Sequence, residues 1–147
     1  MWYHGSNELS EQLFLHQIQT LANSALPNNH YKKNVSVDQA VLDKIGIESR
    51  IHLLRIIQEA LTNIVKHAKA STVSILLYVE LSEVVLNIKD DGRGFSTTSR
   101  QSGKINLGLN SLYERIQEMN GYLEIISDSS GTEIIVSIPF ITTESHF

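Results

Sequence analysis

Apolar residues recur every three or four positions in three stretches of the chain, and this period predicts three helices. The first stretch covers residues 9–25, and "PNNH" ends it. The second and longest runs from Glu48 to Ala68, and the third begins at "LGLNSL" and is expected to stop at Gly121. One face of each helix is apolar, so each is expected to pack against another layer.

Shorter stretches rich in β-branched residues predict strands. A short alternation through Val35 and Val37 indicates an edge strand. Two pairs of strands follow: "STVSILLYVE" with "EVVLNIKD", and a final hairpin that turns at "DSSG". Strands that come mostly as hairpins favour a mixed, mostly antiparallel sheet of about five strands with three helices on one face. The expected fold class is therefore α/β (α+β), a two-layer sandwich.

The length and composition fit one globular domain, because 147 residues with 41% hydrophobic content can bury a core. Residues 1–8 show no periodicity and are expected to be a disordered start. Residues 9–140 are expected to form the domain and residues 141–147 a tail. Residues 96–106 form a long loop rich in glycine, serine and threonine, which is typical of functional loops.

Charge and composition exclude several classes of function. The net charge is −4 and no Lys/Arg cluster occurs, so no nucleic-acid partner is expected. The absence of cysteine excludes disulfides and thiolate metal sites. No apolar run is long enough to span a bilayer, so no direct membrane contact is expected, and the composition is compatible with the cytoplasm.

Four polar side chains recur every fourth residue along the second helix: Arg55, Glu59, Asn63 and His67. Such positions drift by only about 40° per step and therefore share one stripe, which Lys66 borders. A plain solvated helix face is the usual explanation of such a stripe. An asparagine in the middle of a helix is a weak helix former, which favours a functional explanation.

A second candidate lies at the end of a strand, where "KDDGRGF" holds a D-x-G-x-G pattern. Its two glycines, Gly92 and Gly94, permit close approach of a flat ligand, and the carboxylate of Asp90 can accept from an amino group. An ordinary Asp-Gly turn explains the same residues equally well. Further along, Gly103 and Gly108 precede a helix start, which is a good anion site or a simple flexible loop, and "SGT" at residues 130–132 suits a hairpin turn.

The order of these pieces is more specific than any one of them. A helix with E-x-x-x-N-x-x-x-H, a strand ending in D-x-G-x-G-F, a glycine loop with G-L before a helix, and a hairpin with S-G-T resemble the ATP-binding catalytic domain of two-component sensor histidine kinases. That domain belongs to the gyrase, Hsp90, histidine kinase and MutL superfamily with the Bergerat fold. The amino-acid sequences of residues 55–71 and 107–125 resemble those of the nitrate/nitrite sensors and lipid thermosensor kinases.

The resemblance covers residues 13–140 and implies ATP and Mg²⁺ as ligands. Asn63 would hold Mg²⁺, since this hard ion takes oxygen ligands and keeps waters and phosphates. Glu59 would lie by the metal and its waters or help to polarise an attacking group. His67 and Lys66 would face the phosphates.

The resemblance also implies the adenine pocket. Asp90 would accept from the adenine amino group, with Gly92 and Gly94 leaving room for base and ribose. Phe95 would close the edge of the pocket, and the hydroxyl of Thr132 would support Asp90 and the base.

Residues 96–106 would form a lid over the triphosphate. The motif before the third helix would be Asn106, Leu107, Gly108 and Leu109. The family usually has glycine where this chain has Asn106; asparagine tolerates left-handed backbone, so binding can survive there.

The implied activity is transfer of the ATP γ-phosphoryl to a histidine, as in two-component phosphorelays. None of the six histidines precedes an acidic residue, as a phosphoacceptor usually does, so the histidine domain is expected elsewhere, on the same or another chain. A response regulator would be the next partner, and this piece alone is expected to be a monomer. The full protein could be a membrane-anchored bacterial sensor with this part in the cytoplasm.

Two alternatives remain open from the sequence. One is a serine kinase of the anti-sigma-factor type from the same superfamily, which also lacks a histidine hairpin. The other is a degenerate module that binds nucleotide weakly or acts through protein contacts.

Overall fold

The computed structural model describes residues 2–67, 69–92 and 109–140, with side chains described from Gln12 onward and not for residues 67, 109 and 110. Within these ranges the elements in chain order are α1 Trp2–Ala25, β1 Lys32–Val37, the 3₁₀ helix η1 Gln39–Asp43, α2 Ile47–His67, β2 Thr72–Glu80, β3 Glu83–Asp90, α4 Leu109–Glu118, β4 Tyr122–Asp128 and β5 Gly131–Pro139.

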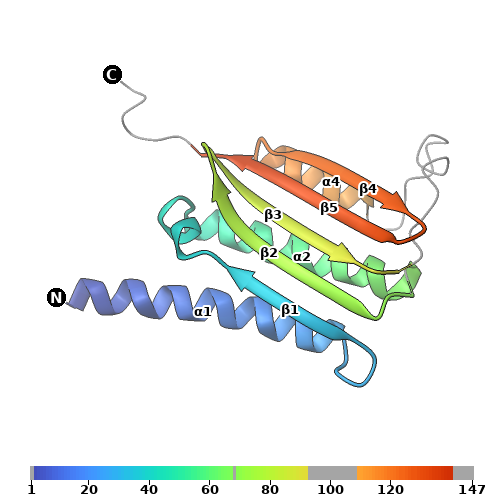
Figure 1. Ribbon diagram of the computed structural model, residues 1–147. Helices are drawn as coiled ribbons and strands as arrows, with labels where there is room; N and C mark the ends of the chain where they lie inside the picture. The colour runs from blue at the N-terminus through green and yellow to red at the C-terminus, as the bar shows by residue number, and fades with distance from the viewer. Residues whose placement is uncertain (1, 68, 93–108, 141–147) are drawn as a thin grey trace.

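The five strands form one sheet in the order β1-β2-β3-β5-β4 (Figure 1). β1 pairs with β2 in parallel, and every other pair is antiparallel. β3 therefore lies at the centre, which suits its sequence, because "VVL" at its start is buried as a continuous apolar run. This confirms the expected mixed and mostly antiparallel sheet.

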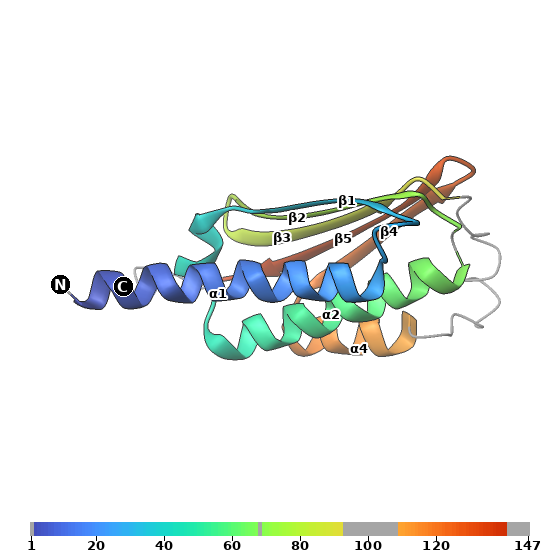
Figure 2. The same cartoon turned by 90° about the horizontal axis from the view of Figure 1, so that it is seen from below.

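The helices α1, α2 and α4 all cover one face of the sheet (Figure 2). Their apolar stripes meet the inward-facing strand residues in one core. Leu53, Ile57 and Leu61 of α2 are fully buried, as are Leu86 of β3 and Val136 of β5. Burying a side chain of this size contributes roughly 1.5–3 kcal/mol, so this layer contact stabilises the fold. The predicted two-layer sandwich is confirmed.

α1 is longer than its apolar pattern predicts. It begins at Trp2, although residues 1–8 show no apolar periodicity. Packing through Phe14, Ile18 and Ala22 already secures the helix. Each further residue then adds a hydrogen bond without a new nucleation cost, so a segment without periodicity can extend it.

The end of α4 differs in detail from the expectation for Gly121. The helix ends at Glu118, and Asn120 takes the left-handed conformation with φ of 57°. Asparagine tolerates this conformation because its short polar side chain bonds locally. A Cβ at Gly121 would lie 3.0 Å from the carbonyl oxygen of Ser137, so this glycine serves the close approach of β4 to β5.

Two apolar residues of the long helix pattern face outward instead of toward the sheet. Ile51 is 47% exposed and Val65 is 46% exposed. Both lie outside the roughly 100° arc that the sheet can cover.

No helix in the described parts of the chain is both long and apolar enough to cross a membrane.

Candidate nucleotide-binding site

Polar residues gather at one end of the sandwich. The C-terminal end of α2, the end of β3, the β4–β5 turn and the start of α4 all lie at this end (Figures 1 and 2). The antiparallel pairing produces this meeting point, because β3 ends where β5 begins. The sequence motifs on the second helix and on the strand end are thereby brought to the same region.

One row of paired residues crosses the sheet here. Asp90 of β3 pairs with Val73 of β2 and Thr132 of β5, and Thr132 pairs with Ser127 of β4. Asp90 shares the parity of the core residue Ile88, so its side chain lies on the face that the helices cover. A carboxylate thus replaces an apolar side chain in the last row of the core.

Asp90 is only 3% exposed. The backbone N–H of Gly92 donates to its Oδ1 at 2.8 Å. Burial raises the pKa of Asp90 above its ordinary 3.8, while hydrogen bonds from the backbone of Gly92 and Thr132 act in the opposite direction. A buried carboxylate is costly unless it is paired, so this group is suited to accept from a ligand.

The hydroxyl of Thr132 has a protein partner. Its Oγ1 lies 2.9 Å from the Oγ of Ser127, and its backbone supports Asp90. The sequence interpretation gave the hydroxyl itself the role of supporting Asp90. Ser127 was missed; the alternation of β4, which places residues 123, 125 and 127 on the inner face, could have identified it.

Gly131 is a second residue that sequence reasoning did not assign to the site. It has φ of 141°, and a Cβ there would lie 2.0 Å from the carbonyl oxygen of Asp90. Only glycine allows the β4–β5 turn to lie this close to the strand that carries the carboxylate. The signal was present in the sequence as the glycine of "SGT".

Asp91 has a structural role beside the site. Its Oδ1 accepts from the backbone N–H of Ser71 and of Thr72, each at 2.8 Å, and its Oδ2 accepts from the hydroxyl of Ser71 at 2.9 Å. These bonds, with that to Thr72 the largest cause, lower the pKa of Asp91 below its ordinary 3.8. They tie the segment that follows α2 to the end of β3.

Glu59 makes an ion pair instead of facing solvent. Its Oε1 accepts from the Nε of Arg115 at 2.7 Å and from the hydroxyl of Ser111 at 3.2 Å. Both partners come from α4. The plain solvated face proposed for the helix stripe is therefore wrong for Glu59, and Arg115 and Ser111 are residues that the sequence did not single out.

Two polar atoms on this stripe are buried without a partner. The Oε2 of Glu59 and the Nδ2 of Asn63 make no hydrogen bond within the described residues. Unpartnered buried polar atoms are rare and call for a ligand, an ion or water. The free carboxylate oxygen of Glu59 fits a hydrated Mg²⁺, which prefers oxygen ligands, whereas the Nδ2 of Asn63 is a donor that fits a phosphate or water oxygen.

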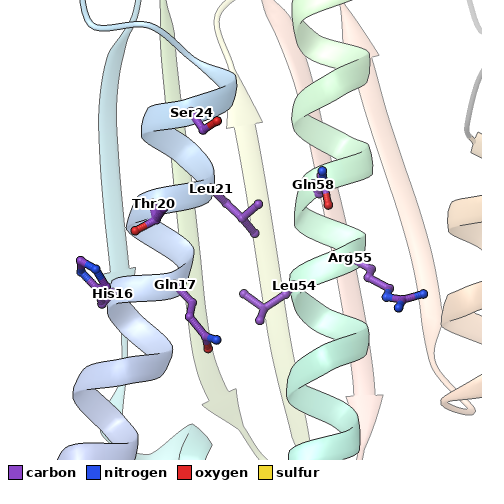
Figure 3. Close-up of a pocket in the computed structure, with 8 residues that line it drawn as sticks. All are labelled: His16, Gln17, Thr20, Leu21, Ser24, Leu54, Arg55 and Gln58. Atoms are coloured by element: carbon purple, nitrogen blue, oxygen red, sulfur yellow. The ribbon is translucent and has the colours of Figure 1, made fainter.

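The other members of the stripe lie differently. Arg55 and Lys66 are exposed, and α2 ends at His67, whose side chain is outside the description. Arg55 lines a groove of about 520 Å³ between α1 and α2, where Leu21 and Leu54 point toward each other (Figure 3). Figure 3 shows the side chain of Arg55 pointing away from α1.

Several predicted site residues lie outside the described residues. They are Gly94, Phe95, the lid at residues 96–106, Leu107 and Gly108, with Asn106 at the end of the lid. Leu109 begins α4, but its side chain is also outside the description.

Comparison with known families gives a match over most of the chain. The Histidine kinase-, DNA gyrase B-, and HSP90-like ATPase family matches residues 48–142. Sensor histidine kinase LiaS of Bacillus subtilis is 40% identical over 67% of this chain. DegS of Brevibacillus brevis, a signal transduction histidine-protein kinase/phosphatase, is 41% identical over 64% of it. The chain spans only 27% and 24% of the lengths of these two relatives.

Solved structures share the fold. The histidine kinase domain of the Erythrobacter litoralis EL346 blue-light activated histidine kinase superposes with a TM-score of 0.71 at 23% identity, over 84% of this chain and 57% of that one. The catalytic domain of histidine kinase ThkA gives a TM-score of 0.68 at 12% identity, over 88% of this chain and 91% of that one. The resemblance drawn from the sequence motifs is confirmed, and the chain belongs to the Histidine kinase-, DNA gyrase B-, and HSP90-like ATPase family.

Proposed function

We propose that this chain binds ATP with Mg²⁺ as the catalytic domain of a sensor histidine kinase. It would position the γ-phosphoryl for transfer to a histidine nitrogen on a separate phosphoacceptor domain. In that transfer the bond from the γ-phosphorus to the bridging oxygen breaks, a phosphorus–nitrogen bond forms, and ADP leaves. The sensor kinases among the relatives support this reading.

The buried carboxylate of Asp90 is the observation that carries the proposal. It lies in the last row of the core, where only a hydrogen-bond donor makes its burial favourable. The exocyclic amino group of adenine is such a donor, and guanine presents a carbonyl oxygen at the equivalent position, so Asp90 would select adenine. Gly92 donates its backbone N–H to this carboxylate, and Gly131 lets the β4–β5 turn lie against the backbone of Asp90.

Asn63 and Glu59 would face the metal and the triphosphate. Bound Mg²⁺ would neutralise phosphate charge in the transition state. The side-chain oxygen of Asn63 would hold this ion together with waters and phosphate oxygens. Its buried and unpartnered Nδ2 supports a role for this amide in ligand binding. Lys66, exposed at the end of α2, would add a positive charge for the phosphates.

The wider organisation is part of the same proposal. Residues 9–140 would be the ATP-binding domain, with residues 96–106 as its lid. The phosphoacceptor domain would belong to the same or another chain, and a response regulator would receive the phosphoryl group. The domain would work in the cytoplasm.

Calorimetric titration with ATP, with and without Mg²⁺, tests the site. We expect the wild type to bind more tightly with Mg²⁺ and Asn63→Ala to lose that dependence. Asp90→Asn keeps the shape of the side chain but turns an acceptor into a donor, and should weaken binding at least tenfold, since a buried donor would face the adenine amino group.

Thr62→Ala is a matched control beside Asn63, because Thr62 is exposed and its hydroxyl donates to the backbone carbonyl of Gln58 in its own helix. It should bind ATP like the wild type. A wild type that gives neither heat nor a nucleotide-dependent melting shift would contradict the proposal and favour a protein-interaction module. Phosphotransfer is then tested by adding labelled ATP and the phosphoacceptor domain of a relative such as LiaS.

A further inference from the structure

One carboxylate oxygen joins α4 to α2. The Oε1 of Glu59 receives both the Nε–H of Arg115 at 2.7 Å and the hydroxyl of Ser111 at 3.2 Å. Ser111 and Arg115 are four residues apart and therefore share a face of α4. The side chains of Arg115 and Glu59 are 25% and 22% exposed, so the pair is shielded more than a surface ion pair.

The second oxygen of the same carboxylate is left without a partner. The Oε2 of Glu59 is buried and makes no hydrogen bond within the described residues. Asn63 lies one turn further along the same stripe, and its Nδ2 is also buried without a hydrogen bond within the described residues. Arg115 and Ser111 thus bind one edge of Glu59 and leave the other edge available beside Asn63.

We propose that Arg115 is a positioning residue that, together with Ser111, fixes the rotamer of Glu59 and compensates its charge, so that a carboxylate can stand beside the polyphosphate of a bound nucleotide. This inference rests on the proposed ATP site and extends it to two residues of α4. Arg115 acts through Glu59 and does not itself touch the nucleotide.

The physical reason is electrostatic. ATP carries several negative charges, and Glu59 on the metal-binding stripe adds another of the same sign. Like charges within a few ångströms oppose each other, whereas a bound guanidinium cancels most of this repulsion. The Nε–H bond and the serine hydroxyl also restrict the carboxylate, so that its unpaired oxygen keeps one direction.

The test is a cycle of variants measured by calorimetry with ATP, both with Mg²⁺ and with chelator. Arg115→Met removes the charge and keeps much of the side-chain bulk. We expect it to weaken metal-free ATP binding about tenfold, as a like charge at close range does. The loss should be smaller with Mg²⁺, which neutralises phosphate charge, and smaller again at high salt.

The double variant Glu59→Gln/Arg115→Met separates charge compensation from simple tethering. It lacks the ion pair but also lacks the repulsive charge, so it should recover metal-free ATP affinity to within about threefold of Glu59→Gln. If the double variant binds as weakly as Arg115→Met, the contact only holds the two helices together and the proposal is wrong. It is also wrong if Arg115→Met binds ATP within twofold of the wild type.

Gln117→Met is the matched control, because Gln117 is exposed on the same helix, and it should leave binding unchanged. Arg115→Lys keeps the charge and should bind within about threefold of the wild type, so the proposal can be decided even if Arg115→Met folds poorly. Failure of the wild type to bind ATP at all would instead contradict the proposed function on which this inference depends.

Discussion

Gly131 and Asp90 are in backbone contact across the β3–β5 pair. A Cβ on residue 131 would lie 2.0 Å from the carbonyl oxygen of Asp90 and 3.0 Å from its carbonyl carbon. The backbone of residue 131 also has φ of 141°, a conformation that residues other than glycine rarely adopt. The turn between the last two strands therefore fixes the position of the strand end that carries the buried carboxylate.

Gly131→Ala should destabilise the domain by about 2–3 kcal/mol, because the added methyl group forces backbone atoms apart and strains φ. Urea unfolding followed by circular dichroism would measure this change. Gly46→Ala is the matched control, since a Cβ there meets nothing within 4 Å. The control should be neutral or slightly stabilising. Equal stability of the two variants would contradict the close contact at residue 131.

Asp91→Asn tests the tie between the end of β3 and the start of β2. The pKa of Asp91 is lowered by its hydrogen bonds to Thr72 and Ser71. A lowered pKa in the folded state means that the ionised form contributes stability above the ordinary 3.8, and that this contribution disappears as pH falls through the folded-state pKa. The wild type should therefore exceed Asp91→Asn in stability at neutral pH, and the difference should shrink on acidification below 3.8.

The size of this difference should be about 1 kcal/mol or less, because the carboxylate is exposed and solvent screens it. Chemical unfolding at several pH values between 7 and 3 gives the measurement. Asp43→Asn changes the same charge at an exposed position of η1 and is the control. A difference between wild type and Asp91→Asn that stays constant over this pH range would rule out the charge-dependent bonds.

The sequence predicts the fold well because apolar residues recur at clear helical and strand spacings. The β-branched runs of β2, β3 and β5 and the apolar stripe of α2 dictate which face of each element is buried. The helical residues before Leu9 could not be predicted in this way, since a helix that is already packed extends without its own apolar stripe. η1 was missed because a single 3₁₀ turn is too short for a periodic signal.

The candidate site was predictable in its chemistry but not in its pairings. Short sequence motifs identify Asp90, Asn63 and Glu59 as residues of interest. They carry no information that Arg115, 56 residues after Glu59, would be its partner, because that contact depends on how α4 packs beside α2. The pairing of Ser127 with Thr132 likewise required the strand register.

Leu81→Gly should stabilise the β2–β3 hairpin. Leu81 is 93% exposed and has φ of 54°, so it buries little apolar surface while it adopts the left-handed conformation. That conformation costs roughly 1–2 kcal/mol for an ordinary residue, and glycine avoids the cost at some loss of chain entropy. The net gain in unfolding free energy should be about 0.5–1 kcal/mol.

Ser82→Gly is the matched control in the same turn, since Ser82 is not among the described residues with positive φ. It should be neutral or destabilising because it only adds freedom to the unfolded chain. Thermal unfolding of both variants beside the wild type would check the pair. A loss of stability in Leu81→Gly would show that the side chain of Leu81 contributes contacts that outweigh its backbone strain.

Asp90 should change its pKa when nucleotide binds. Burial raises the pKa of its carboxyl above 3.8 in the free protein. The amino group of adenine donates a stronger hydrogen bond to the ionised carboxylate than to the protonated acid, so binding should lower this pKa again. By the same linkage, the affinity for ATP should begin to fall at a pH above 3.8 as the medium becomes acidic, because binding then has to displace a proton.

Carboxyl carbon NMR of isotope-labelled protein, titrated with and without saturating Mg²⁺ and ATP, would follow this carboxyl directly. Asp38 is the internal control, since it follows the end of β1 and so lies at the far end of the sheet from the start of β2. Its side chain accepts from the backbone N–H of Ala40. Its carboxyl carbon signal at neutral pH should not change when nucleotide is added. If nucleotide binds but leaves the pKa of Asp90 raised, the adenine amino group is not its partner, and the base must be recognised elsewhere in the site.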